Sequence, residues 1–249
     1  MSSFLIGLLA FTLIFLSAIL MLGLSVLRRK SPASFRDIPA YSRLRHAIGR
    51  VVEDGTRLHV SLGRGPLTTQ QSAAGFAGLT LLRRLAELTS AGDKPPIATS
   101  GDPALTILSQ DTLQAASRAS AQGSYDPSAG RLTGLTPFSY AAGAMPAVRD
   151  ENISTNVLVG NFGVEVALLT DVAERQNTFA LAASDNLTAQ AVMYASAQEP
   201  LIGEELYAAG AYTGAGSLHA ASLTVQDILR WLLILAMLVG AVLKLAGIL

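Results

Sequence analysis

The chain of 249 residues contains no cysteine, and this absence removes several kinds of chemistry at once. Without thiols there can be no disulfide bond, no cysteine nucleophile and no cysteine-ligated zinc or iron–sulfur centre. Histidine is scarce as well, because the three residues His46, His59 and His219 lie far apart in the sequence. No pair of them has the spacing of a metal site. The sequence therefore lacks the side chains from which most metal and thiol sites are built.

The familiar nucleotide and hydrolase motifs are also missing. No Gly-x-x-x-x-Gly-Lys-Ser/Thr sequence is present, and the stretch from Gly63 to Thr68 lacks the third glycine of the Gly-x-Gly-x-x-Gly fingerprint. No Gly-x-Ser-x-Gly nucleophile elbow occurs either. His59 falls inside a predicted strand, where we expect a packed, neutral imidazole. An enzyme is therefore the least favoured function.

The sequence does have two long apolar runs at its ends. Phe4–Leu27 carries no charge, and Leu229–Leu249 is interrupted only by Arg230 and Lys244. An α-helix rises about 1.5 Å per residue, so about 20 apolar residues cross a hydrocarbon core of about 30 Å. Both runs predict transmembrane helices, which makes the lipid bilayer the first expected partner. Neither run has an acid or base at its middle, which disfavours a transporter core.

The basic residues around the first run predict its orientation. Residues 28–50 carry seven cations and one acid, a net charge of +6, whereas no basic side chain precedes Phe4. Lys and Arg collect on the cytoplasmic flank of membrane helices. We therefore expect the central part in the cytoplasm and both termini outside. A cleaved signal peptide is the alternative, but it would need a basic start, a shorter apolar core and a small-residue cleavage site.

The central part is acidic. Residues 51–222 carry nine cations and sixteen acids, a net charge of −7. Binding to nucleic acid needs a basic surface, so nucleic acid is not an expected partner. The basic segment before it suits an anionic membrane surface. These changes in charge and hydropathy along the sequence divide the chain into an N-terminal span with its basic stop (1–30), a basic juxtamembrane linker (31–50), an α/β domain (51–222) and a C-terminal span (223–249).

Short apolar strands alternate with helices of 10 to 20 residues throughout the central part. This alternation is typical of a parallel sheet with helices on both faces. We therefore predict an α/β, Rossmann-like, doubly wound domain, preceded by a short basic amphipathic helix on the membrane surface. The expected strands are 57–62, 97–99, 131–135, 155–160 and 178–182, and the expected helices are 70–89, 103–121, 138–148, 163–175, 187–197 and 199–212.

Four loops that follow predicted strands carry the residue types of a ligand site. In doubly wound sheets ligands bind outside the carboxyl ends of the strands, where glycines admit close approach and helix N-termini attract anions. The same Ser, Thr, Asp and Asn residues are also what helix caps are made of, so a purely structural role stays open. The candidate ligand-binding residues are Gly63, Arg64, Gly65, Thr68, Thr69, Ser100, Asp102, Gly160, Asn161, Ser184, Asp185 and Asn186.

Three stretches resemble an uncharacterised family of bacterial membrane proteins. They are Arg57–Gly63, Tyr140–Met145 and Asp227–Trp231. The resemblance implies an N-terminal span, a cytoplasmic α/β body and a C-terminal span in a bacterial cytoplasmic membrane. It implies no activity, cofactor or catalytic residue.

Two hypotheses of function follow. The first is a non-enzymatic, membrane-anchored domain that assembles with copies of itself, because two anchors hold the bodies in one layer and raise their effective concentration. Repeated small residues in Tyr140–Ala144 and Tyr207–Ala211 would allow close packing of helices or subunits. The second is a domain that senses a small ligand or nucleotide at the four loops, and an enzyme acting at the same loops is the less favoured alternative to it. The cofactor and any soluble partner are unknown at this level.

Overall fold

The computed structural model describes residues 3–28, 35–69, 72–120 and 125–247. The chain forms two compact units, one comprising Asp37–Ala215 and the other comprising the segments before and after it. Three predicted features lie outside the described residues, namely the basic pair at 29–30, the helix start at Gln70 and the loop start at Gly123.

The unit made by the two ends of the chain contains two long helices. These are α1 (Ser3–Arg28) and α9 (Ser217–Leu245), and both are long and apolar enough to cross a membrane. The hydroxyl groups of Ser25 and Ser217 lie 3.2 Å apart, so the two helices meet at this level. The second helix begins at Ser217 rather than at Leu229 as predicted, because no glycine or proline breaks the intervening sequence.

The other unit is built on a six-stranded, fully parallel sheet, which confirms the doubly wound fold. Its strand order is β3-β2-β1-β4-β5-β6, the order of Rossmann-type domains. Val60 on β1 pairs with Ala98 on β2 and Val157 on β4, so β1 and β4 form the centre. The strands are β1 (Arg57–Gly63), β2 (Ile97–Ser100), β3 (Gly130–Leu132), β4 (Ile153–Asn161), β5 (Phe179–Ser184) and β6 (Glu199–Leu201).

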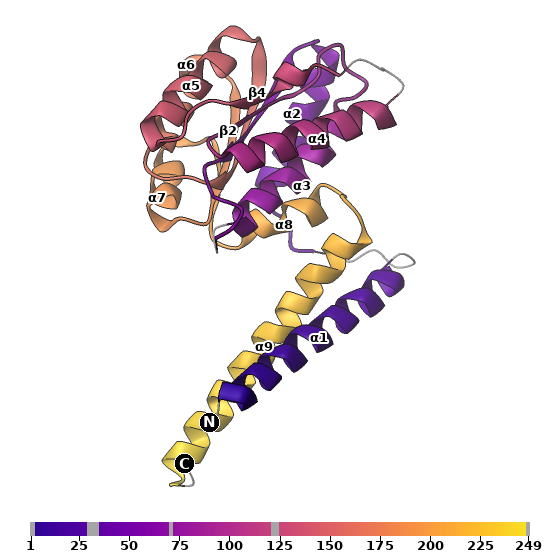
Figure 1. Ribbon diagram of the computed structural model, residues 1–249, viewed down its shortest axis with the longest axis vertical. Helices are drawn as coiled ribbons and strands as arrows, with labels where there is room; N and C mark the ends of the chain where they lie inside the picture. Colours follow the sequence, from indigo (N-terminus) through magenta and orange to yellow (C-terminus); the bar gives the residue numbers. More distant parts are fainter. Residues whose placement is uncertain (1–2, 29–34, 70–71, 121–124, 248–249) are drawn as a thin grey trace. The chain divides into compact units, whose positions relative to one another are not determined.

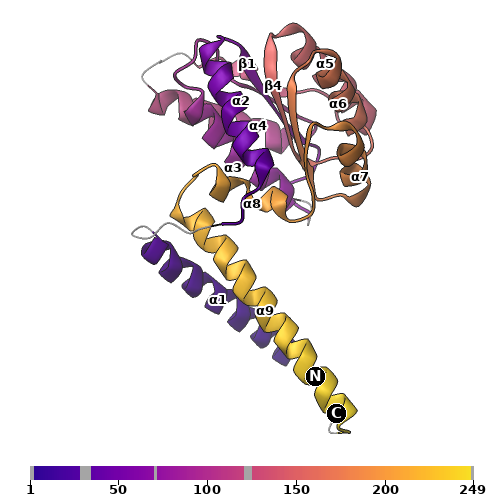
Figure 2. The same ribbon diagram turned by 180° about the vertical axis from the view of Figure 1, so that it is seen from behind.

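Helices cover both faces of this sheet (Figures 1 and 2). Leu58, Val60 and Leu62 on β1 point into a core closed by the first set of helices, while His59 and Ser61 point to the opposite face. The first set is α2 (Pro39–Glu53), α3 (Ser72–Leu88), α4 (Pro103–Ala119) and α8 (Glu205–Tyr212), and the second is α5 (Pro137–Asp150), α6 (Val166–Arg175) and α7 (Leu187–Ser196), with a short 3-10 turn at Pro127–Ala129.

Helix α2 differs from its predicted role. It was expected to lie on the membrane surface as part of a linker, but its apolar face is buried in the core of the α/β unit, with Leu44 and Val51 almost fully covered. The helix therefore has no apolar face left for lipid, and the compact unit begins at Asp37 rather than at residue 51. Its basic residues Arg43 and Arg45 lie on the opposite, exposed face.

The predicted helix over Glu199–Tyr212 is wrong in its first part. Glu199–Leu201 instead forms β6, the edge strand, which pairs with β5 through Leu181 and Ala183. An edge strand tolerates Pro200, whose missing N–H would disrupt a central strand. Glu199 is buried and forms an ion pair with Arg43 of α2, a long-range contact that helical periodicity cannot reveal.

Candidate functional site

All four predicted loops lie at the carboxyl edge of the sheet. Gly63 ends β1, Ser100 ends β2, Asn161 ends β4 and Ser184 ends β5. Gly160 is the penultimate residue of β4, and Asp185 follows β5 directly. The edge is continuous, because the Gly101 N–H donates to the Gly63 carbonyl at 2.9 Å and the Asn161 amide donates to Asp185 at 2.8 Å.

The centre of this edge, between β1 and β4, is tightly closed by backbone. Gly63 has a φ of 71°, and a Cβ atom there would lie 2.1 Å from the carbonyl oxygen of Asn161. A Cβ atom on Gly160 would lie 2.0 Å from the carbonyl oxygen of Leu62. The Arg64 N–H donates to the Asn161 carbonyl at 2.8 Å. Both glycines are therefore required by strand–strand contact at the point where a Rossmann-type domain holds its ligand.

Arg64 lies beside this closed centre, and its side chain is held by contacts within the protein. Its Nε is 3.4 Å from Oε1 of Glu165, and its Nη1 donates to the Leu135 carbonyl at 3.4 Å. Glu165 is almost fully buried just before α6 and also accepts the Gly163 N–H at 3.0 Å. Sequence reasoning identified Arg64 but missed Glu165, because acids before a helix are common and nothing marks this one as buried.

Polar residues at the other strand ends cap helices or brace loops. Asp102 accepts the Leu105 N–H at 2.9 Å as N-cap of α4, and Asn186 accepts the Thr188 N–H at 3.0 Å as N-cap of α7. Ser100 Oγ accepts the Asp102 N–H at 3.1 Å. Ser184 Oγ accepts the Phe162 N–H at 3.2 Å and the Asn186 N–H at 3.3 Å.

The remaining predicted residues lie in the β1–α3 connection. Gly65 is buried, whereas Thr68 and Thr69 are exposed in a turn. The Thr69 hydroxyl donates to the Pro66 carbonyl at 3.0 Å, which is a local turn contact. These two threonines make no described contact with Arg64 or with the other strand-end loops, so the structure does not join them to a common site.

A chain of buried polar side chains runs beneath the closed centre, on the face covered by α5. His59 Nδ1 is 2.7 Å from Asn156 Oδ1, and His59 Nε2 is 2.9 Å from the Thr99 hydroxyl. The Tyr140 hydroxyl accepts the Gly63 N–H at 3.2 Å and contacts the Ser61 hydroxyl, and Thr99 lies close enough to it to lower the Tyr140 pKa. One polar chain therefore links three strands to α5.

Burial keeps the ionisable members of this chain of polar side chains, His59 and Tyr140, neutral. It lowers the pKa of His59 to about 4, and Arg131 adds to the effect, although the hydrogen bond that His59 donates to Asn156 Oδ1 opposes it. Burial raises the pKa of Tyr140 to about 12 against the opposing hydrogen bonds from Ser61, Thr99 and Gly63. A neutral imidazole with a high-pKa phenol is typical of a packed network rather than of a proton-transfer site at neutral pH.

Exposed apolar side chains surround the polar residues of the carboxyl edge, and the sequence analysis did not single them out. We call this set the apolar rim. Its members have between 40% and 80% of their surface exposed and follow strands β3, β4, β5 and β6. The signal available in the sequence was a large apolar residue at the end of a predicted strand or in the first turn of a predicted helix. The apolar rim comprises Leu135, Phe138, Val164, Leu187 and Ile202.

Three cavities open at the opposite, amino edge. The largest, about 490 Å³, lies by Arg57, Thr89 and Asp126, and a second, about 420 Å³, lies by Thr170 and Asn177. A third of about 170 Å³ lies by Asp54. Across the described parts of the chain, no group of three or more His, Asp or Glu side chains is arranged to hold a metal ion.

Comparison with known proteins gives a family match. The family described as "Domain of unknown function (DUF6754)" matches residues 3–249, which covers both long helices and the α/β unit. No curated protein matches the chain, and no solved structure matches it either.

Proposed function

The chain belongs to the DUF6754 family of unknown function, and from its structure we propose that it is a membrane-anchored, non-enzymatic α/β module that assembles with copies of itself. The membrane is a bacterial cytoplasmic membrane crossed by α1 and α9. The α/β unit lies on the cytoplasmic side, because seven cations between residues 28 and 50 follow the first span. Both termini lie outside.

The observation that carries the proposal is the closed carboxyl edge. In a Rossmann-type domain this edge binds the ligand, yet here the backbones of Gly63 and Asn161 meet and their polar groups are paired within the chain. Arg64, the one cation among the predicted site residues, is engaged by buried Glu165. A scaffold needs rigidity at this edge rather than access, and these contacts supply it.

Assembly is supported by the tethering of the α/β unit at both ends. Two spans confine all copies to one layer, so weak contacts between copies act at a high effective concentration. The mass of the full chain in mild detergent, followed over a tenfold dilution, tests this. A discrete mass of several copies is expected, whereas a monomer at every concentration would refute assembly.

A second candidate is a small-ligand or nucleotide sensor at the four loops. The strand order favours it, because β3-β2-β1-β4-β5-β6 places a topological switch point between β1 and β4. Isothermal titration of the full chain with nucleotides, compared with the variant Arg64→Ala, separates the two. Saturable binding that Arg64→Ala removes would favour the sensor.

A further inference from the structure

The two edges of the α/β unit have opposite surface chemistry. The carboxyl edge carries the apolar rim, with Leu187 the most exposed member at 80%. The turns that enter β1 to β5 at the amino edge carry exposed charges instead, and among their described residues only Leu88, 36% exposed at the end of α3, is a large exposed apolar side chain. These charged residues are Glu53, Asp54, Asp93, Asp126, Arg149, Asp150, Glu174 and Arg175.

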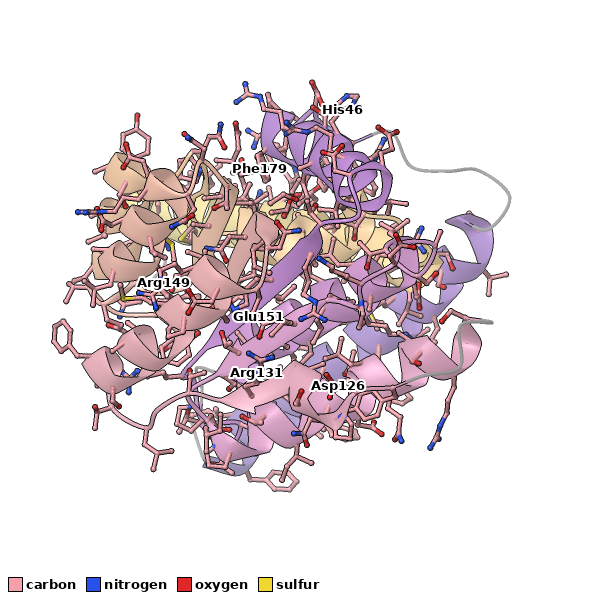
Figure 3. The ribbon with its side chains drawn as sticks, turned by 90° about the horizontal axis from the view of Figure 1, so that it is seen from above. His46, Asp126, Arg131, Arg149, Glu151 and Phe179 are labelled. Carbon is pink, nitrogen blue, oxygen red and sulfur yellow. The ribbon has the colours of Figure 1, made fainter. Side chains whose placement is uncertain are left out.

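Ion pairs add to the polar character of the amino edge. Glu151 accepts from Arg57 at 2.6 Å and from Arg131 at 2.8 Å, and Figure 3 shows Arg131, Glu151 and Asp126 lying close together. A hydrated, charged edge of this kind suits solvent. Apolar side chains on four separate loops, in contrast, mark an interaction surface when they gather at one edge.

Both chain ends of the α/β unit lie beside the apolar edge. Helix α2 ends at the amino edge, where Arg50 lies by Phe179, the first residue of β5, so the first turn of α2 points toward the carboxyl edge. The Tyr41 hydroxyl donates to the carbonyl of Glu205, four residues after β6 ends, at 2.6 Å. The Tyr41 ring stacks on Tyr212 at 4.9 Å. The chain therefore enters and leaves the unit near this edge.

Short connections then lead to the helices that are long enough to cross a membrane. Helix α1 ends at Arg28 and α2 begins at Pro39. A fully extended chain of this length spans at most about 38 Å. Helix α9 begins five residues after Tyr212. The two connections are therefore short enough to keep the carboxyl edge within reach of a bilayer surface.

We propose that the apolar rim docks on the lipid surface, with Leu135, Phe138, Val164, Leu187 and Ile202 in the interfacial region. Leucine, isoleucine and phenylalanine favour this region when a polar backbone scaffold holds them at one level. Asp102, Asp185 and Glu204 lie at the same edge, so the fitting surface is zwitterionic rather than strongly anionic. The inference rests on the proposed membrane anchoring and is independent of assembly.

The cysteine-free sequence allows single probes in the full chain. Leu187→Cys places a fluorophore on the rim, and Tyr194→Cys is the matched control, because both lie on α7 seven residues apart and are 80% and 74% exposed. The control lies about 10 Å further along the same helix face. Leu135→Cys repeats the test on another loop.

The labelled proteins are reconstituted in phosphatidylcholine vesicles, and quenching is measured with headgroup-level nitroxide lipid and with aqueous iodide. We expect the probes at 187 and 135 to be quenched several-fold more by lipid, and several-fold less by iodide, than the probe at 194. Equal iodide quenching at all three positions would overturn the inference. Shielding at 187 from both quenchers would also overturn it, by showing a protein contact such as a second copy. Failure of the protein to float with vesicles would instead refute the anchoring.

Discussion

Lowering the pH provides a stringent test of the buried polar chain. His59 is fully buried, and its pKa is lowered from 6.5 to about 4, chiefly because burial disfavours the charged imidazole. Between these values the unfolded chain binds a proton that the folded chain does not. Stability from this residue is therefore complete above about pH 6.5 and is lost progressively as the pH falls toward 4.

The shift sets the size of the effect. A difference of one pKa unit corresponds to 1.36 kcal/mol, so the full transition costs about 3 kcal/mol, of which about 2 kcal/mol is lost by pH 5. Carboxylates titrate over part of the same range, so a comparison of variants is needed. His59→Gln removes the titration while keeping a polar side chain, and His46→Gln removes an exposed imidazole from the same unit.

Near-ultraviolet circular dichroism of tyrosine measures the unfolding. All six tyrosines lie in the α/β unit, whereas the single tryptophan, Trp231, lies in α9. Urea unfolding of the full chain in detergent at pH 7 and pH 5 gives the free energy of unfolding for each variant. We expect the loss between pH 7 and pH 5 to be about 2 kcal/mol smaller in His59→Gln than in wild type or His46→Gln. Equal losses in all three proteins would refute the reasoning.

Three further predictions use the same unfolding measurement. Gly63→Ala should lower the free energy of unfolding by several kcal/mol, because its Cβ would lie 2.1 Å from a carbonyl oxygen. Gly203→Ala, at a similar positive φ, meets open space and should lower it by about 1 to 2 kcal/mol. Equal losses in the two variants would contradict the closed centre. Tyr41→Phe should cost about 1 kcal/mol through loss of its 2.6 Å hydrogen bond, and an unchanged midpoint would show that the bond contributes nothing. The double variant Arg64→Ala with Asp102→Ala should fold, with a free energy of unfolding about 2 kcal/mol lower, because Arg64 neutralises the buried Glu165 carboxylate and Asp102 is the N-cap of α4. Unchanged stability would make both residues candidates for ligand binding again.

The architecture of the α/β unit was predictable because its signals are local. Alternating apolar strands and capped helices indicate a parallel sheet, and Asp102 with Pro103 marked the start of α4 correctly. Glycine and proline disfavour a helix interior, yet α5 continues through Gly143 and Pro146. Gly143 is instead needed for contact, since its Cβ would lie 2.1 Å from the Thr133 carbonyl.

Features that depend on contacts distant in sequence were not predictable. The edge strand β6 is specified by pairing with β5 and by the ion pair of Glu199 with Arg43, 156 residues away. The basic pattern of α2 favoured a membrane surface, but its apolar face had a place in the core that only the folded sheet reveals. Periodicity identifies an apolar face without identifying what covers it.

The candidate site shows the same division. The strand-end loops were placed correctly, because parallel strands bring their carboxyl ends to one edge. Their side chains could not be assigned from sequence, since caps and ligand sites use the same residue types. Tyr140 comes from a helix that approaches the edge only after folding, whereas Glu165 follows β4 closely but carries no signal of its burial; both occupy space and hydrogen bonds that a ligand would need.

Energy transfer between copies in a bilayer tests the proposed assembly most directly. Full-length Tyr194→Cys protein is labelled separately with donor and acceptor dyes, mixed in detergent and reconstituted together in vesicles. The vesicles are then fused with increasing amounts of empty lipid. Transfer is expected to persist after dilution, because assembled copies stay together. Transfer that falls to the level of randomly distributed monomers would contradict it.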